Sequence, residues 1–98
     1  MDLSTVPEKF RDDVRQAVTT LLEYGARDVY LFGSLTTNTW RENSDIDLAI
    51  AGMEPRLFFK AYALASRKLV HELDLVDLDH EEAMARFLME TQGLVKIA

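Results

Sequence analysis

The chain has 98 residues, a length that predicts a single small domain covering residues 1–98. Hydrophobic residues make up 48% of it and charged residues 29%, so it can form a hydrophobic core and differs in composition from disordered chains. A formal net charge of −6 argues against DNA binding, and the absence of cysteine excludes disulfides and thiol chemistry. We expect a cytoplasmic protein without a membrane span. Because a domain this small buries a limited core, we also expect it to associate with a partner or with copies of itself.

The first half of the chain predicts a helix, a strand and a loop, in that order. The Thr-Val-Pro-Glu sequence at 5–8 matches a capping box, and apolar residues at helical spacing follow it, so we expect a helix over 6–24. Gly25 ends this helix, and residues 28–32 have the β-branched and aromatic side chains of a buried strand. The polar stretch 35–43 predicts a loop that contains one short helix.

The second half predicts two further strands, each followed by a helix or a turn. We expect a strand over 45–51, then a helix over 57–69 whose apolar residues repeat at three-to-four spacing. The period changes to two over 73–78, which predicts a third strand, and Asp79 is expected to cap a last helix. The apolar tail 93–98 is expected to pack on the domain. The expected fold is α/β (α+β), a small mixed β-sheet flanked by helices.

Five residues have a spacing that indicates chemistry: Gly33, Ser34, Asp45, Asp47 and Asp74. Ten residues separate Ser34 from Asp45, and Asp74 lies 27 positions after Asp47. Residues two apart on a strand point to the same side, so Asp45 and Asp47 present two carboxylates together. A hard divalent cation relieves their repulsion in a half-buried strand, which predicts Mg²⁺. Asp74, on a separate strand, can complete the metal site and accept the proton of an attacking hydroxyl.

The Gly33-Ser34 pair falls where a strand gives way to a helix. Glycine lets a phosphate approach the backbone, free amides at a helix start attract anions, and Ser34 adds a hydroxyl donor. A Gly-Ser pair alone is most often a turn, and an Asp-x-Asp pattern alone also occurs in solvent-facing strands. The combination at this spacing therefore carries the prediction of a nucleotide site.

The segments LFGSLTTNTWRENSDIDLAI and LDLVDLD, within residues 28–79, resemble the minimal nucleotidyltransferase (MNT) family of the DNA-polymerase-β-like superfamily. Its signature is Gly-Ser, a ten-residue gap and Asp-x-Asp. The resemblance implies a nucleotidyltransferase-like fold and ATP bound at Gly33 and Ser34. It also implies two Mg²⁺ ions, with Asp45, Asp47 and Asp74 as metal-binding and catalytic acids.

The resemblance also implies a partner and a reaction. Members of this family commonly act as antitoxins beside an all-helical HEPN toxin, and they transfer AMP from ATP to a tyrosine of that toxin. This chain departs from the family at Leu35 and Asn38, where a basic residue and a glycine are usual, and Arg41 is the candidate replacement cation. Two alternatives stay open: an antitoxin that neutralises its toxin by binding alone, and a nucleotidyltransferase acting on a small molecule such as an aminoglycoside.

Several other polar and aromatic residues have a structural interpretation that we prefer to a functional one. Trp40 is expected to cover the edge of the core rather than stack on a nucleobase. His71 and His80 are expected to be solvated, and neither has the spacing of a zinc ligand. Asp77, on the opposite strand face from Asp74, and Asp79 are expected to be surface or cap residues. Met84, Phe87, Leu88 and Met89 of the last helix are expected to pack in the core on one side, and because four large apolar residues are more than one helical stripe needs, a contact with a partner stays open as well.

Overall fold

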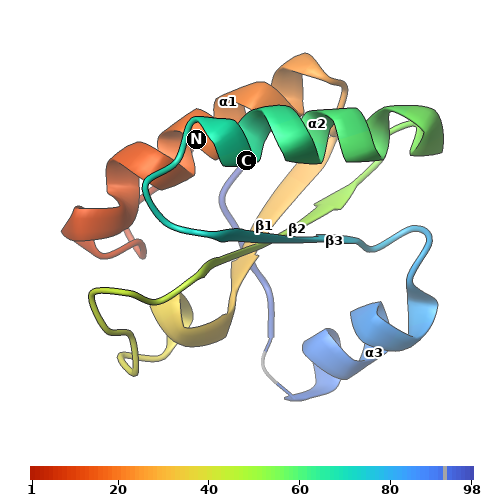
Figure 1. The fold of residues 1–98 in the computed structure, drawn as a ribbon. Coiled ribbons are helices and arrows are strands. Elements are labelled where there is room, and N and C mark those ends of the chain that lie inside the picture. Colours follow the sequence, from red (N-terminus) through yellow and green to blue (C-terminus); the bar gives the residue numbers. More distant parts are fainter. Residues whose placement is uncertain (92) are drawn as a thin grey trace.

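The computed structural model describes residues 1–91 and 93–98, which form a mixed sheet between two layers of helix (Figure 1). In chain order the elements are η1 (Glu8–Phe10), α1 (Arg11–Glu23), β1 (Asp28–Phe32), η2 (Gly33–Thr36), β2 (Ile46–Ala51), α2 (Pro55–Arg67), β3 (Leu73–Asp77), α3 (Glu82–Thr91) and β4 (Val95–Lys96). The strand order is β3-β2-β1-β4, and α1 and α2 cover one face of the sheet while α3 lies on the other. None of the described helices has the length and apolar character needed to cross a bilayer.

The main core lies between the sheet and the helices α1 and α2. Alternate residues of β2, namely Ile46, Leu48 and Ile50, are fully buried in this core, as the period of a strand requires. Each such side chain contributes about 1.5–3 kcal/mol of hydrophobic stabilisation relative to an exposed position. The intervening residues of β2 point to the α3 side, where a smaller cluster contains Phe32, Ala49, Val76 and Leu88.

The sheet is mixed because β2 pairs with β1 in antiparallel and with β3 in parallel orientation. The parallel pair requires a crossover, which α2 supplies. The hydroxyl of Tyr62 on α2 donates a hydrogen bond of 2.9 Å to the carbonyl of Leu73, the first residue of β3. In the resulting register Asp47 lies opposite Asp74, so the fold itself brings these two acids together.

The beginning of the first helix differs from the prediction. The 5–8 segment does not cap this helix. The helix is preceded by the 3-10 turn η1, whose N-cap residue Pro7 makes no side-chain cap bond. Val6 is instead buried in the core, so packing rather than capping holds this segment. The short helix predicted within 35–43 begins two residues earlier, as the 3-10 turn η2 directly after β1. The hydroxyl of Thr36 donates a hydrogen bond of 2.7 Å to the carbonyl of Gly33 within it.

The turn after β3 confirms one further prediction, Asp77 as a cap residue, and corrects another, Asp79 as the cap of α3. Asp77 is buried rather than on the surface, and its Oδ1 accepts a hydrogen bond of 3.0 Å from the amide of Asp79. Asp79 does not cap α3, because its Oδ2 accepts a hydrogen bond of 2.7 Å from the amide of Gly52 and so ties this turn to the end of β2. Asp77 therefore caps its own turn, while Asp79 joins the loop after β3 to the loop after β2.

The C-terminal tail packs on the domain, as predicted, but it does so as a strand. Val95 and Lys96 pair with Leu31 and Tyr30 of β1, and Ile97 is buried in the main core. The sequence did not predict a strand here because two residues are too few to display a period of two.

Candidate active site

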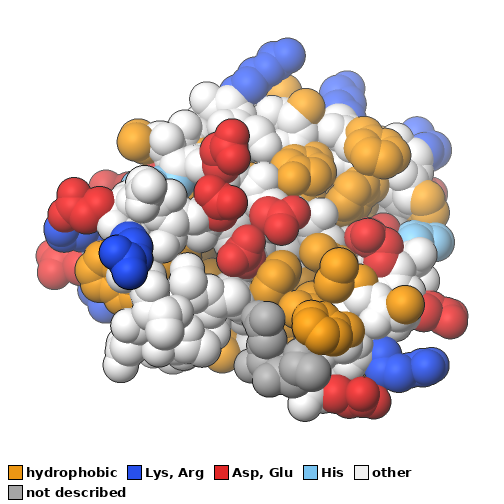
Figure 2. Space-filling model, turned by 60° about the horizontal axis from the view of Figure 1, so that its bottom comes forward, with side chains coloured by type: hydrophobic (Ala, Val, Ile, Leu, Met, Phe, Trp, Pro, Cys, Tyr) orange, Lys and Arg blue, Asp and Glu red, His pale blue; other side chains and the backbone are white. Residues whose placement is uncertain are grey.

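Asp47 and Asp74 lie side by side on the face of the sheet that α3 shares. Paired residues of neighbouring strands point to the same side, and the partner of Asp47 across the β2–β3 ladder is Asp74. Asp45 precedes β2 by one residue and is exposed, as is Asp74, while Asp47 is half-buried. Figure 2, which brings this face forward, shows acidic side chains gathered at its centre with hydrophobic side chains beside them.

The carboxylate of Asp47 also lies against the backbone of Gly33. Phe32 of β1 is the cross-strand partner of Asp47, and the chain turns at Gly33 with a φ of 76°. A Cβ atom added at Gly33 would stand 2.1 Å from Oδ2 of Asp47, a distance that no real contact allows. Glycine is therefore required here twice, for the backbone conformation and for the space that Asp47 occupies.

The three acids form a region of uncompensated negative charge. Partial burial, with the charges of Asp74 and then Asp45 adding to it, raises the pKa of Asp47 to about 6. Among the described residues, no Lys, Arg or His forms an ion pair with any of the three carboxylates. The site consequently favours whatever supplies positive charge, either a proton or a cation.

This donor set fits a magnesium ion in its chemistry. Hard cations such as Mg²⁺ take carboxylate oxygens as ligands and keep several waters, so one or two carboxylates suffice to hold an ion. Within residues 1–91 and 93–98, no three acidic or histidine side chains are arranged as a ready-made metal cage. The fit therefore rests on the adjacency of Asp47 and Asp74 and on their mutual repulsion, and the assignment of Asp45, Asp47 and Asp74 as ligands stays a prediction.

The loop after Gly33 shows how the chain accommodates its departures from the family pattern. Asn38, which stands where a glycine is usual, has a φ of 60°, so the left-handed conformation is kept by the residue type that tolerates it best after glycine. Leu35, which stands where a basic residue is usual, is buried in the main core. Ser34 precedes both residues, lies in η2 directly after Gly33 and is half-buried, at the predicted phosphate position.

Arg41 lies in the same loop, in an exposed turn. Its amide donates a hydrogen bond of 2.7 Å to the hydroxyl of Ser44, and the amide of Ser44 donates one of 3.0 Å to the carbonyl of Arg41. The backbone of Arg41 is thus held in a short, closed turn a few residues before Asp45. Its role as the cation that contacts a triphosphate stays a prediction.

Two predictions about aromatic and histidine residues have different outcomes. Trp40 covers the edge of the main core, as expected, with its ring edge-on to Phe10 at 5.5 Å between centroids. His71 is not solvated, because its side chain is only 18% exposed and is bonded to Asp13. No local pattern could have shown this contact, since 58 positions separate the two residues.

The comparisons with known proteins identify the fold and the family. A family model described as Polymerase beta, Nucleotidyltransferase matches residues 16–95. A toxin–antitoxin structure with AMP-PNP has 22% identity and a TM-score of 0.64, and the match covers 82% of this chain and 69% of that one. A mutant of the toxin–antitoxin MntA-HpeT has 20% identity and a TM-score of 0.62, with the same coverage. No curated protein sequence matches the chain. At these identities the two structures show a shared fold.

Proposed function

Because the chain belongs to the polymerase beta nucleotidyltransferase family, we propose that it transfers AMP from ATP to a hydroxyl of a partner protein, a tyrosine of a HEPN-type toxin. The observation that carries this proposal is the adjacency of Asp47 and Asp74 beside the glycine turn at Gly33. The fold shared with chains of two toxin–antitoxin structures supports the choice of partner. The proposal includes a cytoplasmic location, where ATP and the toxin are both present.

In the proposed reaction each residue has a separate role. The backbone at Gly33 and the hydroxyl of Ser34 bind the phosphates of ATP. Asp45, Asp47 and Asp74 would hold Mg²⁺, which supplies charge neutralisation of the phosphate oxygens when it is bound. Asp74 accepts the proton of the attacking hydroxyl. The hydroxyl oxygen forms a bond to the α-phosphorus while the bond from that phosphorus to the bridging oxygen breaks, and pyrophosphate leaves.

The acceptor in this proposal comes from another macromolecule. Asp45 and Asp74 are exposed, so a hydroxyl can approach them from solvent without a rearrangement of the described residues. A docked protein then orients its own hydroxyl toward the α-phosphate, which a small enzyme does not do by itself. The orientation of the two reacting groups is a large part of the rate gain in group transfer.

A second candidate function is neutralisation of the toxin by binding alone. The observation that favours it is Leu35, because a buried leucine at this position leaves no cation next to Ser34 to stabilise the departing pyrophosphate. Transfer to a small molecule is a third alternative, for which the described residues offer no specific support.

Mass spectrometry of the intact partner separates these possibilities. The protein is incubated with ATP, Mg²⁺ and the product of the adjacent gene, and the partner is weighed. We expect a gain of one or more AMP units that is lost in Asp45→Asn and Asp47→Asn and falls steeply in Asp74→Asn. Asp12→Asn is the matched control, since Asp12 is an exposed acid on α1, the helix on the other face of the sheet. An unmodified partner held in a stable complex would establish the binding-only function instead.

A further inference from the structure

The segment 37–45 joins the Gly33-Ser34 turn to Asp45 and contains no helix or strand. Its internal hydrogen bonds, such as that between the hydroxyls of Thr37 and Thr39 at 2.8 Å, shape its turns but do not attach it to the body of the domain. A loop of this kind opens easily unless other elements hold it. The position of Asp45 therefore depends on the contacts that the segment makes with the rest of the molecule.

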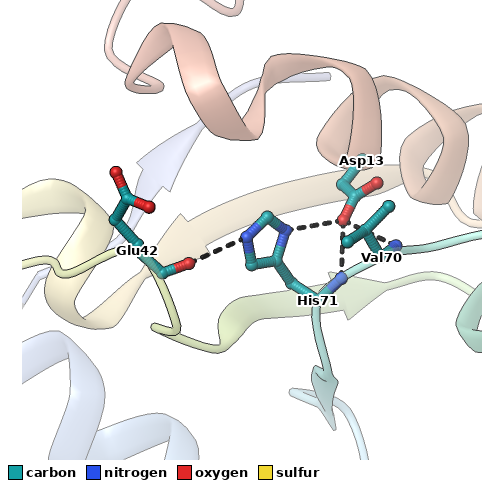
Figure 3. A network of polar contacts seen from close by, with 4 residues as sticks. All are labelled: Asp13, Glu42, Val70 and His71. Atoms are coloured by element: carbon teal, nitrogen blue, oxygen red, sulfur yellow. Dashed lines mark hydrogen bonds and ion pairs between the residues drawn. The ribbon is translucent and has the colours of Figure 1, made fainter.

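His71 supplies one of these contacts through a network shown in Figure 3. The ring lies in the connection between α2 and β3, with Nδ1 at 2.8 Å from Oδ2 of Asp13 on α1. The other ring nitrogen, Nε2, lies 3.1 Å from the carbonyl oxygen of Glu42 in the middle of the 37–45 segment. One imidazole thus connects α1, the start of β3 and the loop that leads to Asp45.

Asp13 holds the imidazole in a fixed orientation. Its Oδ2 also accepts hydrogen bonds from the backbone amides of Val70 and His71, at 3.0 and 2.8 Å. Burial alone would raise the pKa of Asp13, but these bonds and that from the His71 ring outweigh burial and lower it, so the carboxylate is charged and only accepts. The carboxylate of Asp13 thus fixes one edge of the ring, and the opposite ring nitrogen, Nε2, lies within hydrogen-bond distance of the Glu42 carbonyl.

Aromatic packing reinforces the same connection. The His71 ring packs against Phe10 at 4.4 Å between centroids, and Phe10 also contacts Trp40, which belongs to the 37–45 segment. The side chain of Glu42 adds an ion pair with Lys9 of η1. Immediately after His71, the carbonyl of Glu72 accepts a hydrogen bond of 2.8 Å from the amide of Ile46, which aligns the first residue of β2 with the start of β3.

We propose that His71 is a positioning residue: by joining Asp13 to the Glu42 carbonyl it holds the 37–45 segment, and through it Asp45, in the arrangement that binds ATP. The expected effect of His71 on ATP binding rests on the proposed function. Its effect on the position of the 37–45 segment does not depend on that function. The hydrogen bonds of the His71 ring go to Asp13 and Glu42 and not to Asp45, Asp47 or Asp74, so His71 acts through the loop and not on the reacting atoms.

Trp40 provides a direct test, because it is the only tryptophan of the chain and lies in the segment concerned. Acrylamide quenching of Trp40 fluorescence is measured on the full chain for the wild type, His71→Phe and His71→Gln. His71→Phe keeps the ring packing on Phe10 but has no ring nitrogen to face Asp13 or the Glu42 carbonyl. His71→Gln keeps one amide donor and serves if the first variant does not fold. His80→Phe is the matched control, since His80 is exposed and lies after β3.

We expect the quenching constant to rise about twofold in His71→Phe and less in His71→Gln, because the segment opens locally. The dissociation constant for ATP with Mg²⁺ should rise about tenfold in His71→Phe, as lost positioning requires. His80→Phe should match the wild type in both measurements. Quenching that is unchanged in folded His71 variants would overturn the proposal, and so would unchanged ATP affinity beside increased quenching. If the wild type binds no ATP, the proposed function fails, while quenching still decides whether His71 holds the segment.

Discussion

Asp47→Asn should stabilise the metal-free protein, although it removes an acid from the candidate site. The folded state raises the pKa of Asp47 from 3.8 to about 6, so the charged form is disfavoured by folding. That shift corresponds to about 3 kcal/mol at pH above 7 if it is realised in full. Because the side chain is only half-buried, solvent screening reduces this figure, and we expect a gain of about 1–2 kcal/mol in the free energy of unfolding.

The sign of the pH dependence follows from the direction of the shift. Between pH 3.8 and about 6 the folded wild type binds more protons than the unfolded chain, so its stability falls as the pH rises through this window and levels off above it. Asparagine does not titrate. The advantage of Asp47→Asn is therefore complete near pH 8 and falls to about half near pH 5.

Urea denaturation in buffer containing a chelator, at about pH 5 and about pH 8, measures this difference. Asp74→Asn removes one cause of the shift and should flatten the wild-type dependence in part, while Asp12→Asn, whose side chain is 98% exposed, should leave it unchanged. Added Mg²⁺ should reverse the order of stability, since it binds the folded wild type and not the variant. An equal stability difference at both pH values, or an Asp47→Asn variant less stable than the wild type, would refute the electrostatic account.

Three further outcomes follow from the geometry. Gly33→Ala should lose about 2–4 kcal/mol of unfolding free energy and displace the Asp47 carboxylate. Gly25→Ala, at a similarly strained φ of 97° but with open space around it, should lose only about 1 kcal/mol. Equal losses by urea denaturation would disprove the close approach to Asp47. Asn38→Gly should be neutral or stabilising and Asn38→Val should cost about 1–2 kcal/mol, and a tolerated valine in the same assay would contradict the left-handed conformation. Asp13→Asn should lower the free energy of unfolding by about 1–3 kcal/mol at neutral pH. This loss should shrink as the pH falls below about 4, because the pKa of Asp13 is lowered in the folded state and its stabilising contribution is lost when the carboxylate is protonated in acid. In thermal denaturation from about pH 3 to about pH 7, a loss that stays constant would contradict this assignment.

The strands and the acids could be predicted where the signal is local. The alternation of Leu73, Leu75 and their neighbours predicted β3, and it placed Asp74 on a different strand from Asp47, which is confirmed. The register that sets Asp47 opposite Asp74 could not be predicted and comes from the structure. These patterns work because a strand has a fixed period of two and because one face of this sheet must be buried.

The contacts that could not be predicted join distant parts of the chain. Asp13 and His71 meet only after α1 and the start of β3 have packed, and neither residue has neighbours that distinguish it from a surface acid or histidine. Asp79 was assigned to the wrong partner for the same reason, since the Gly52 amide that it binds lies 27 positions away. Single-residue chemistry indicates what a side chain can bind, while the partner depends on the tertiary arrangement.

The parallel register of β2 and β3 also bears on how such a site is lost or retained over evolutionary time. Backbone hydrogen bonds, and not the carboxylates, set the separation of Asp47 and Asp74, and neutral drift at either position would leave the scaffold intact. For Asp47, drift toward an uncharged residue is even favoured by stability, because its charge opposes folding. The fold of the metal-free chain therefore does not require the charge of Asp47.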